Sequence, residues 1–441
     1  MKQSKHNIYY SPKEVRTILE RSIDTALDGL KCYCNDPVSD FTRCRKLPAR
    51  SLIECIMSFS NYSSIGELSH FFVGQGEMPS ASALSQRRQL LDPDIFKRIN
   101  NLFVSAFDDH TTINGYHILA QDGSDVNIPF MDDKTKTEKH DAKSFCQYHV
   151  NALYDCLNKV FYDWSIDAAS KKREVNALIS ILKDRNYPQN SIFTADRGYE
   201  SYNLMAHFIE NDIKFVIRVK DIHTKSGLMT NIKTEEGAFD IRVTRTLTSL
   251  QTKEIKADKE KYIFVPSTSN FDFLDETRDL YDLSFRAVRF KISEDTYETV
   301  VTNLSEEEFK TEDFKELYHY RWNEETAFNK LKYTIGLVYF HARKRKLIQQ
   351  EINAAFLMYN VSEVIIRNID LKKNKKPELE YDYKPNFSSA VTNIRLYLRK
   401  KINMRELILR IKKFLVAQRP ERSYERNIKG QSCKPLNYRT S

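Results

Sequence analysis

The stretch YHYRWNEETAFNKLK, residues 318–332, is the segment on which the interpretation of the fold depends. Four of its polar residues stand at offsets 0, 3, 7 and 14, which places them within about 60° of one another around a helix axis. These residues, referred to below as the stripe, are Tyr318, Arg321, Glu325 and Lys332. Such a stripe is either a solvated, salt-bridged helix face or one wall of a functional site. Evidence from the rest of the chain is needed to decide between these two interpretations.

Length and composition describe a folded protein of several domains. The chain has 441 residues, of which 41% are hydrophobic and 12% aromatic. Apolar runs such as AAFLMY (354–359) are far too short to span a bilayer, and the first 15 residues lack the apolar core of a signal peptide. The seven cysteines are scattered without a CxxC pair, which indicates reduced thiols. We therefore expect a cytoplasmic protein with no membrane partner.

Positive charge is concentrated at the C-terminus. The net charge is +9, but residues 341–441 hold 24 Lys and Arg against 9 Asp and Glu, so the first 340 residues carry −6. This asymmetry favours a polyanionic partner, nucleic acid before membrane, because no strongly apolar face accompanies the basic clusters. A merely soluble basic surface is the alternative.

The N-terminal region is predicted to be helical. Ser11 can cap a helix, Pro12 suits its first turn and Glu14 completes a capping box ahead of an amphipathic segment. Further helices are predicted over residues 48–59, 64–72, 81–91 and 93–107.

The helix predicted over 81–91 is short and polar, with Arg87 and Arg88 on its expected exposed side. Arginine side chains on such a helix can read bases in a major groove, so both are candidate DNA contacts. The segment could equally be an ordinary surface helix.

From residue 116 onward, strands interleave with helices, which predicts an α/β core. One strand is predicted to end in Asp122, a hairpin to turn near Asn158, and a short strand to end in Asp196. Residues 221–304 alternate, are rich in Thr, Val, Ile and Phe, and are interpreted as an all-β insertion. The predicted divisions are a helical DNA-binding region (1–110), a first core part (111–220), the insertion (221–304), a second core part with the stripe (305–345), and a basic helical region with a tail from about 419 (346–441).

Three carboxylates form a candidate metal site. Asp122 and Asp196 follow predicted strands, where open α/β sheets bind ligands, and Glu325 lies on the stripe. Converging carboxylates suit Mg²⁺ or Mn²⁺, and two such ions can activate an attacking hydroxyl and stabilise the leaving oxygen of a phosphodiester. In isolation, Asp122 would be a turn residue and Asp196 a helix cap. Asp125 also lies close to Asp122, which we prefer because it is expected to end the strand.

The spacing Y-(2)-R-(3)-E-(6)-K of the stripe resembles the signature of bacterial DDE transposases of the insertion-sequence-four family. The contexts QDGSDVNIP around Asp122 and TADRGYES around Asp196 resemble that family's two aspartate motifs. KFVIRVKD, VVTNL and SALSQRRQLL are similar to further family segments, so the resemblance covers about residues 45–435.

This resemblance implies a ribonuclease-H-like catalytic core with a β-rich insertion between the second aspartate and the glutamate. It implies that Asp122, Asp196 and Glu325 are the catalytic acids and hold two Mg²⁺ or Mn²⁺ ions. Double-stranded DNA would lie opposite the stripe. The implied phosphate contacts are Tyr318, Arg321 and Lys332, with Trp322 beside them.

The implied function is cutting at insertion-sequence ends and joining them to target DNA, by a nucleoid-associated homodimer acting on paired ends. Some relatives cut through a DNA hairpin and stack a base on a tryptophan of the insertion, but this chain has only Trp164 and Trp322, both outside it. The alternatives are a catalytically inactive transposase-derived DNA-binding protein and a metal-dependent endonuclease without strand transfer.

Overall fold

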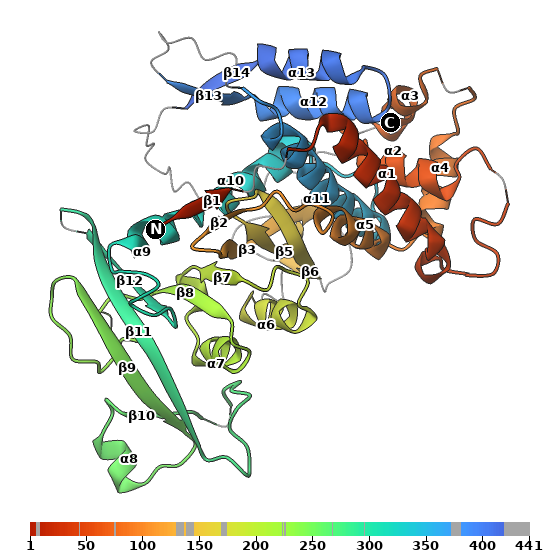
Figure 1. The fold of residues 1–441 in the computed structure, drawn as a ribbon. Helices are drawn as coiled ribbons and strands as arrows, with labels where there is room; N and C mark the ends of the chain where they lie inside the picture. The colour runs from red at the N-terminus through yellow and green to blue at the C-terminus, as the bar shows by residue number, and fades with distance from the viewer. Residues whose placement is uncertain are drawn as a thin grey trace.

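The computed structural model describes residues 1–5, 9–43, 45–74, 76–128, 136–137, 145–168, 174–222, 224, 226–266, 268–294, 296–371 and 381–418. A long mixed sheet forms the centre of the molecule, and helices lie on both sides of it (Figure 1). The prediction of an α/β protein is confirmed. The predicted tail from about 419 lies outside the described residues.

The N-terminal helices form where the sequence predicts them. Ser11 caps α1, Pro12 begins it, and the capping box with Glu14 is present, so this prediction is confirmed. The helical elements of this region are α1 (Pro12–Asp28), η1 (Leu30–Tyr33), α2 (Ala49–Met57), α3 (Ser64–Phe72), α4 (Ala81–Leu90) and α5 (Asp94–Val104).

The central sheet has the strand order β10-β9-β11-β12-β8-β7-β3-β5-β4, with β6 also paired to β5. Its strands are β3 (His117–Ile128), β4 (Lys136–Thr137), β5 (Phe145–Asp155), β6 (Val160–Ala168), β7 (Ser191–Ala195), β8 (Lys214–Val219), β9 (Phe239–Thr248), β10 (Tyr262–Phe264), β11 (Leu280–Ser293) and β12 (Thr296–Thr302). Smaller two-stranded sheets pair β1 (Gln3–Lys5) with β2 (Thr111–Ile113) and β13 (Asp382–Pro385) with β14 (Leu415–Gln418).

Within this sheet, β3, β7 and β8 run parallel, while β5 is antiparallel to β3 and β6 to β5. The turn between β5 and β6 contains Asn158, as predicted. Between the strands come α6 (Glu174–Asp184), η3 (Arg197–Tyr199) and α7 (Tyr202–Glu210). Figure 1 shows α6 and α7 on one side of these strands and α5 and α11 (Arg345–Arg367) on the other.

The segment predicted as an all-β insertion continues the main sheet. Its last strand, β12, pairs antiparallel with β8, so the arm that β9 and β11 form is an extension of the central sheet (Figure 1). The arm also carries the short helix α8 (Lys253–Ala257), capped by Thr252, so "all-β" was wrong for these residues. A Thr cap followed by good helix formers is sufficient for one turn.

The stripe was predicted on a single helix, but the segment is divided into α9 (Asp313–His319), α10 (Trp322–Lys330) and the π-helical turn η4 (Leu331–Ile335). The backbone of Tyr320 and Arg321 keeps helical angles, so the chain passes from α9 to α10 without leaving the helical region. The chain continues through α11, α12 (Phe387–Leu398) and α13 (Met404–Lys413).

Helix α11 is buried along most of its length and joins the helical region to the sheet. The indole of Trp164, on β6, stacks on the ring of Phe356 with a centroid distance of 4.4 Å and donates to Asn353 Oδ1 at 2.8 Å. Trp164 is therefore a core residue. Among the described residues, no helix combines the length and apolarity that crossing a bilayer requires.

Candidate active site

The two predicted aspartates emerge side by side from the central sheet. The parallel pairing of β3 with β7 ends at Gln121 and Ala195, and Asp122 and Asp196 are the next residues of their chains. Strand β3 does not end at Asp122 as predicted, because Asp122 to Ile128 continue to pair with β5. The pairing of β3 with β7 stops before Asp122, so from this residue onward β3 has an unpaired edge on the β7 side.

Local hydrogen bonds fix both carboxylates. Asp122 Oδ1 accepts from the amide of Gly123 at 2.8 Å, and Asp196 Oδ1 accepts from the amide of Gly198 at 2.7 Å. Asp196 thereby caps the 3₁₀ turn η3, as predicted for a helix cap, and it also directly follows strand β7. Both side chains are held by the backbone of the residues that follow them.

Electrostatics make the site attractive to a cation. Burial raises the pKa of Asp122 to about 6; the Gly123 amide and Arg321 oppose this rise, and the charges of Asp196 and Glu174 add to it. Negative charge gathered in a partly desolvated place costs free energy that a bound cation would relieve.

Arg321 joins the helix to the sheet. Its side chain is only 5% exposed, and its guanidinium lies 3.8 Å from Asp122 Oδ2 and 3.3 Å from Glu325 Oε1. The stripe therefore does not form a solvated helix face at Arg321. This residue pairs with a glutamate of its own helix and with the first aspartate, and so brings Glu325 to the strand ends.

The other stripe residues differ in their access to solvent. Tyr318 is 1% exposed and offers no surface to DNA, so the phosphate contact implied for it is unsupported, and burial raises the pKa of its phenol. Lys332 is partly buried; burial lowers the pKa of its ammonium group, and Asp125 and Asp122 oppose that shift. Trp322 is 38% exposed, and its ring centroid lies 5.4 Å from the Arg321 guanidinium carbon.

The sequence interpretation missed Glu324. This side chain is fully buried, and neither of its carboxyl oxygens has a hydrogen-bond partner within the described part of the chain. Burial and the charge of Asp122 raise its pKa well above the ordinary range, which favours the neutral form. Its position beside Glu325 in sequence was visible, but its inward direction depends on how α10 meets β3.

The donor set fits a hard divalent cation, since it consists of carboxylates from two strand ends and a helix. As the side chains stand, no three His, Cys, Asp or Glu residues of the described ranges are grouped tightly enough to hold an ion. Glu325 Oε1 lies 3.3 Å from the Arg321 guanidinium.

Arg88, predicted on the exposed side of its helix, is 2% exposed. Its guanidinium donates to Glu351 Oε1 and to the Leu347 carbonyl, both at 2.7 Å, so that prediction was wrong. Burial alone would raise the pKa of Glu351, but Arg88 and His341 outweigh it and hold it at about 2. Arg88 therefore fastens α4 to α11.

Arg87 remains partly exposed. Its Nε donates to the Leu47 carbonyl at 3.1 Å, and its guanidinium lies over the ring of Phe41. Of the two arginines, only Arg87 keeps a surface from which DNA could be contacted.

Arg88→Ala is expected to lower the free energy of unfolding by about 3–5 kcal/mol, because it leaves the Glu351 carboxylate buried without its main partner. Arg87→Ala should cost about 1 kcal/mol, since its stacking on Phe41 is half exposed. Urea denaturation of the two variants measures this difference. Equal losses would show that the buried pair does not stabilise the fold as argued.

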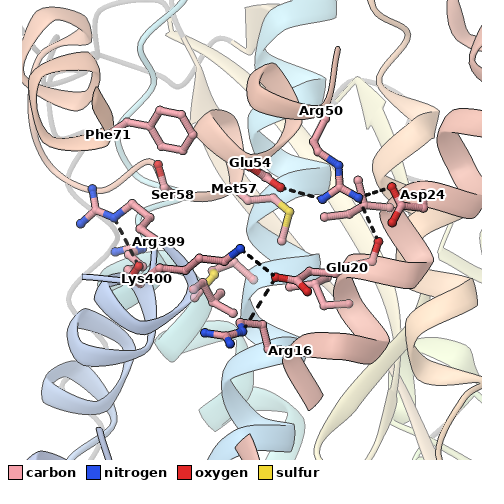
Figure 2. Close-up of a pocket in the computed structure, with 15 residues that line it drawn as sticks. Arg16, Glu20, Asp24, Arg50, Glu54, Met57, Ser58, Phe71, Arg399 and Lys400 are labelled. Atoms are coloured by element: carbon pink, nitrogen blue, oxygen red, sulfur yellow. Dashed lines mark hydrogen bonds and ion pairs between the residues drawn. The ribbon is translucent and has the colours of Figure 1, made fainter. Parts of the chain in front are cut away.

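A cavity of about 420 Å³ lies in the helical layer, between α1, α2 and α12 (Figure 2). Its charges pair with one another: Arg50 contacts Asp24 and Glu54, and Lys400 lies 3.9 Å from Glu20. None of the three candidate acids lines it, so it is separate from the candidate active site.

Comparison with known proteins identifies the class. The model of the transposase DDE domain matches residues 113–361, a range that includes Asp122, Asp196 and Glu325. The chain belongs to this family, whose members are nucleases and transferases that use divalent metal ions.

A solved structure similar to this chain is the cryo-EM structure of the piggyBac transposase synaptic complex with hairpin DNA. The two chains are 11% identical, the alignment covers 96% of this chain and 90% of that one, and the TM-score is 0.46. Comparison with curated proteins finds no match.

Proposed function

We propose that this chain is an active DNA transposase of the insertion-sequence-four family, which cuts at the ends of its element and joins the freed 3′-hydroxyl groups to target DNA. The observation that carries the proposal is the position of Asp122 and Asp196 at one sheet edge, with Glu325 linked to Asp122 through Arg321. In this proposal, carboxylates from three separate elements would supply the oxygen ligands that two-metal phosphoryl transfer uses.

In this proposal Asp122, Asp196 and Glu325 hold two Mg²⁺ or Mn²⁺ ions. Bound there, the ions would activate the attacking oxygen and neutralise charge on the transferred phosphoryl group. The residues of the chain contribute orientation: Arg321 fixes the distance between the helix carboxylate and Asp122, and its planar fork is suited to a phosphate. Trp322, exposed beside it, is a candidate contact for DNA.

A ribonuclease-H-like core is supported by the strand order β6-β5-β3-β7-β8, in which only β5 is antiparallel to both neighbours. We infer that residues 111–220 and 305–345 form this core, with 221–304 as its insertion. Residues 1–110 and 346–441 would then be flanking regions that contact DNA.

The partners in this proposal are double-stranded element ends and target DNA, engaged by a homodimer with one chain per end. With Trp164 in the core and Trp322 on α10, no tryptophan is offered by the insertion, so a hairpin route lacks its expected stacking residue.

The test is a Mg²⁺-dependent assay on a fragment carrying the genomic DNA that flanks the reading frame, scored for both cleavage and joining. Cleavage with joining is the expected result. Cleavage alone would support the endonuclease alternative, and binding alone the inactive alternative. Inverted repeats bracketing the gene would supply the substrate.

Lys332→Ala should weaken binding to end DNA and lower the slope of log affinity against log salt by about one, because one phosphate contact is lost. Lys332 is partly buried beside Asp122 and Asp125, so its stem is ordered and its charge lies at the site. Binding titrations at several salt concentrations measure the slope. An unchanged slope would limit Lys332 to neutralising the carboxylates.

A further inference from the structure

An imidazole clamped between two carboxylates lies beside the candidate metal site. His149 on β5 stands opposite Asp125 of β3, and its Nδ1 lies 2.7 Å from Asp125 Oδ1. Its Nε2 lies 3.0 Å from Oε1 of Glu174, the first residue of α6. The His149 side chain is 3% exposed. Three elements therefore meet through one buried ring.

Glu174 lies over the turns that follow both catalytic aspartates. A side chain at Gly123 would begin 2.9 Å from Glu174 Oε1, and one at Gly198 would begin 3.7 Å from Glu174 Oε2 and 3.0 Å from Asp196 Oδ1. Glu174 is also one of the charges that raise the pKa of Asp122. The carboxylate of Glu174 thus lies beside the turn that follows Asp196 and close enough to Asp122 to act on its charge, and Gly123 leaves room for the His149 ring and for Glu174.

The position of the His149 ring between Asp125 and Glu174 orients the Glu174 carboxylate. Burial alone would lower the pKa of His149, but hydrogen bonds and charges from Asp125 and Glu174 outweigh it and raise the pKa to about 9. The ring thus bridges the two carboxylates, with a hydrogen bond between Nδ1 and Asp125 and an ionic contact between Nε2 and Glu174. The imidazolium fixes Oε1 of Glu174, which leaves Oε2 on the side of Gly198 and Asp196.

We propose that Glu174 is a fourth carboxylate of the cation site, contacting a bound ion directly or through its water, and that His149 positions it. This inference rests on the proposed function, in which Asp122, Asp196 and Glu325 hold divalent cations. Outer partners that orient a metal ligand typically change affinity by roughly 10–100-fold when removed. His149 is accordingly a positioning residue, and Asp125 anchors it from β3.

A purely structural role would have different consequences. If the Asp125–His149–Glu174 chain only fastens α6 to the sheet, its loss lowers stability and leaves cation affinity unchanged. Glu174→Gln is the informative variant, because glutamine keeps an acceptor for the imidazole while losing the carboxylate charge. A measurement of metal affinity distinguishes the metal-ligand role from the structural role, whereas a loss of cleavage activity would follow from either.

The experiment measures Mn²⁺ binding to the full chain without DNA, by electron paramagnetic resonance of free Mn²⁺, together with thermal unfolding. Glu174→Gln and His149→Gln are each expected to weaken binding roughly tenfold or more. The double variant should be no weaker than Glu174→Gln alone, because both act through one carboxylate. Glu254→Gln, an exposed glutamate on α8, is the matched control and should bind as the wild type does.

Each outcome bears on a different claim. Wild-type Mn²⁺ affinity in a folded Glu174→Gln variant overturns the fourth-ligand role. If Mn²⁺ binding weakens in Glu174→Gln but not in His149→Gln, His149 does not position Glu174. If His149→Gln does not fold, Asp125→Asn tests the same contact from the other side of the ring. Asp122→Asn serves as the reference: if it binds like the wild type, or if the wild type binds no Mn²⁺, the proposed metal site itself fails.

Discussion

Asp122→Ala, Asp196→Ala and Glu325→Ala are each expected to abolish DNA cleavage while the chain still folds and binds element ends. Removing one carboxylate removes a ligand that hard divalent cations require, and two ions cannot be held by the remaining pair. The prediction is most specific for Asp122, because it directly follows the last β3–β7 pair and so lies at the open edge of the sheet.

Folding should survive these changes. Burial has raised the pKa of Asp122 to about 6, so near neutral pH its carboxylate is ionised against the preference of its surroundings, and its loss relieves that cost. Thermal unfolding and end binding therefore accompany the cleavage assay. Asp108→Ala, an exposed aspartate of the helical region, is the matched control and should cleave normally.

The outcomes also decide between the alternatives. Substantial Mg²⁺-dependent cleavage by any one of the three variants would remove that residue from the site. If the unaltered chain binds ends without cutting them, the chain is a DNA-binding derivative of a transposase in spite of its intact acids.

The position of Asp122 and Asp196 where the β3–β7 pairing ends could be predicted, because the sequence signals for it are local. Apolar, β-branched residues before Asp122 and Asp196 identify buried strands, and parallel strands that end at the same edge bring their next residues together. The capping box at Ser11 is local in the same way, since its partners lie within four residues. Sequence signals that span only a few residues do not depend on how the rest of the chain folds.

Contacts between distant segments could not be predicted in this manner. Arg88 looked exposed because its helix has no marked apolar face, yet it is neutralised by Glu351, 263 residues later in the chain. Glu174 and His149 carry no spacing pattern, and only the β3–β5 register and the start of α6 bring them together. Buried polar residues are recognised from their partners, which a single sequence does not display.

The spacing of the four stripe residues did not predict the local geometry of their segment. It predicted one straight helix, whereas α9, α10 and a π-helical turn divide the segment and place Lys332 beyond the regular helix. Arg321 and Glu325 still meet, because Arg321 is the N-cap of α10 and residues four apart lie on the same face of a helix.

Arg321→Lys is expected to bind end DNA nearly as the wild type does and to cleave it roughly 100-fold more slowly. Lysine keeps the positive charge that attracts the phosphates, but it loses the planar fork that reaches Asp122 and Glu325 together. Misplacing a reacting group by about 1 Å can cost a factor of this size. Binding and single-turnover cleavage of the same end fragment measure the two effects separately.

Two comparisons make this variant informative. Arg98→Lys, at an exposed position on α5, should leave both binding and cleavage unchanged and so controls for the exchange of residue type. Arg321→Ala should lose cleavage too and also weaken binding, because the charge is gone. If Arg321→Lys cleaves like the wild type, the fork has no positioning role, and the pairs of Arg321 with Asp122 and Glu325 serve only to join α10 to the sheet.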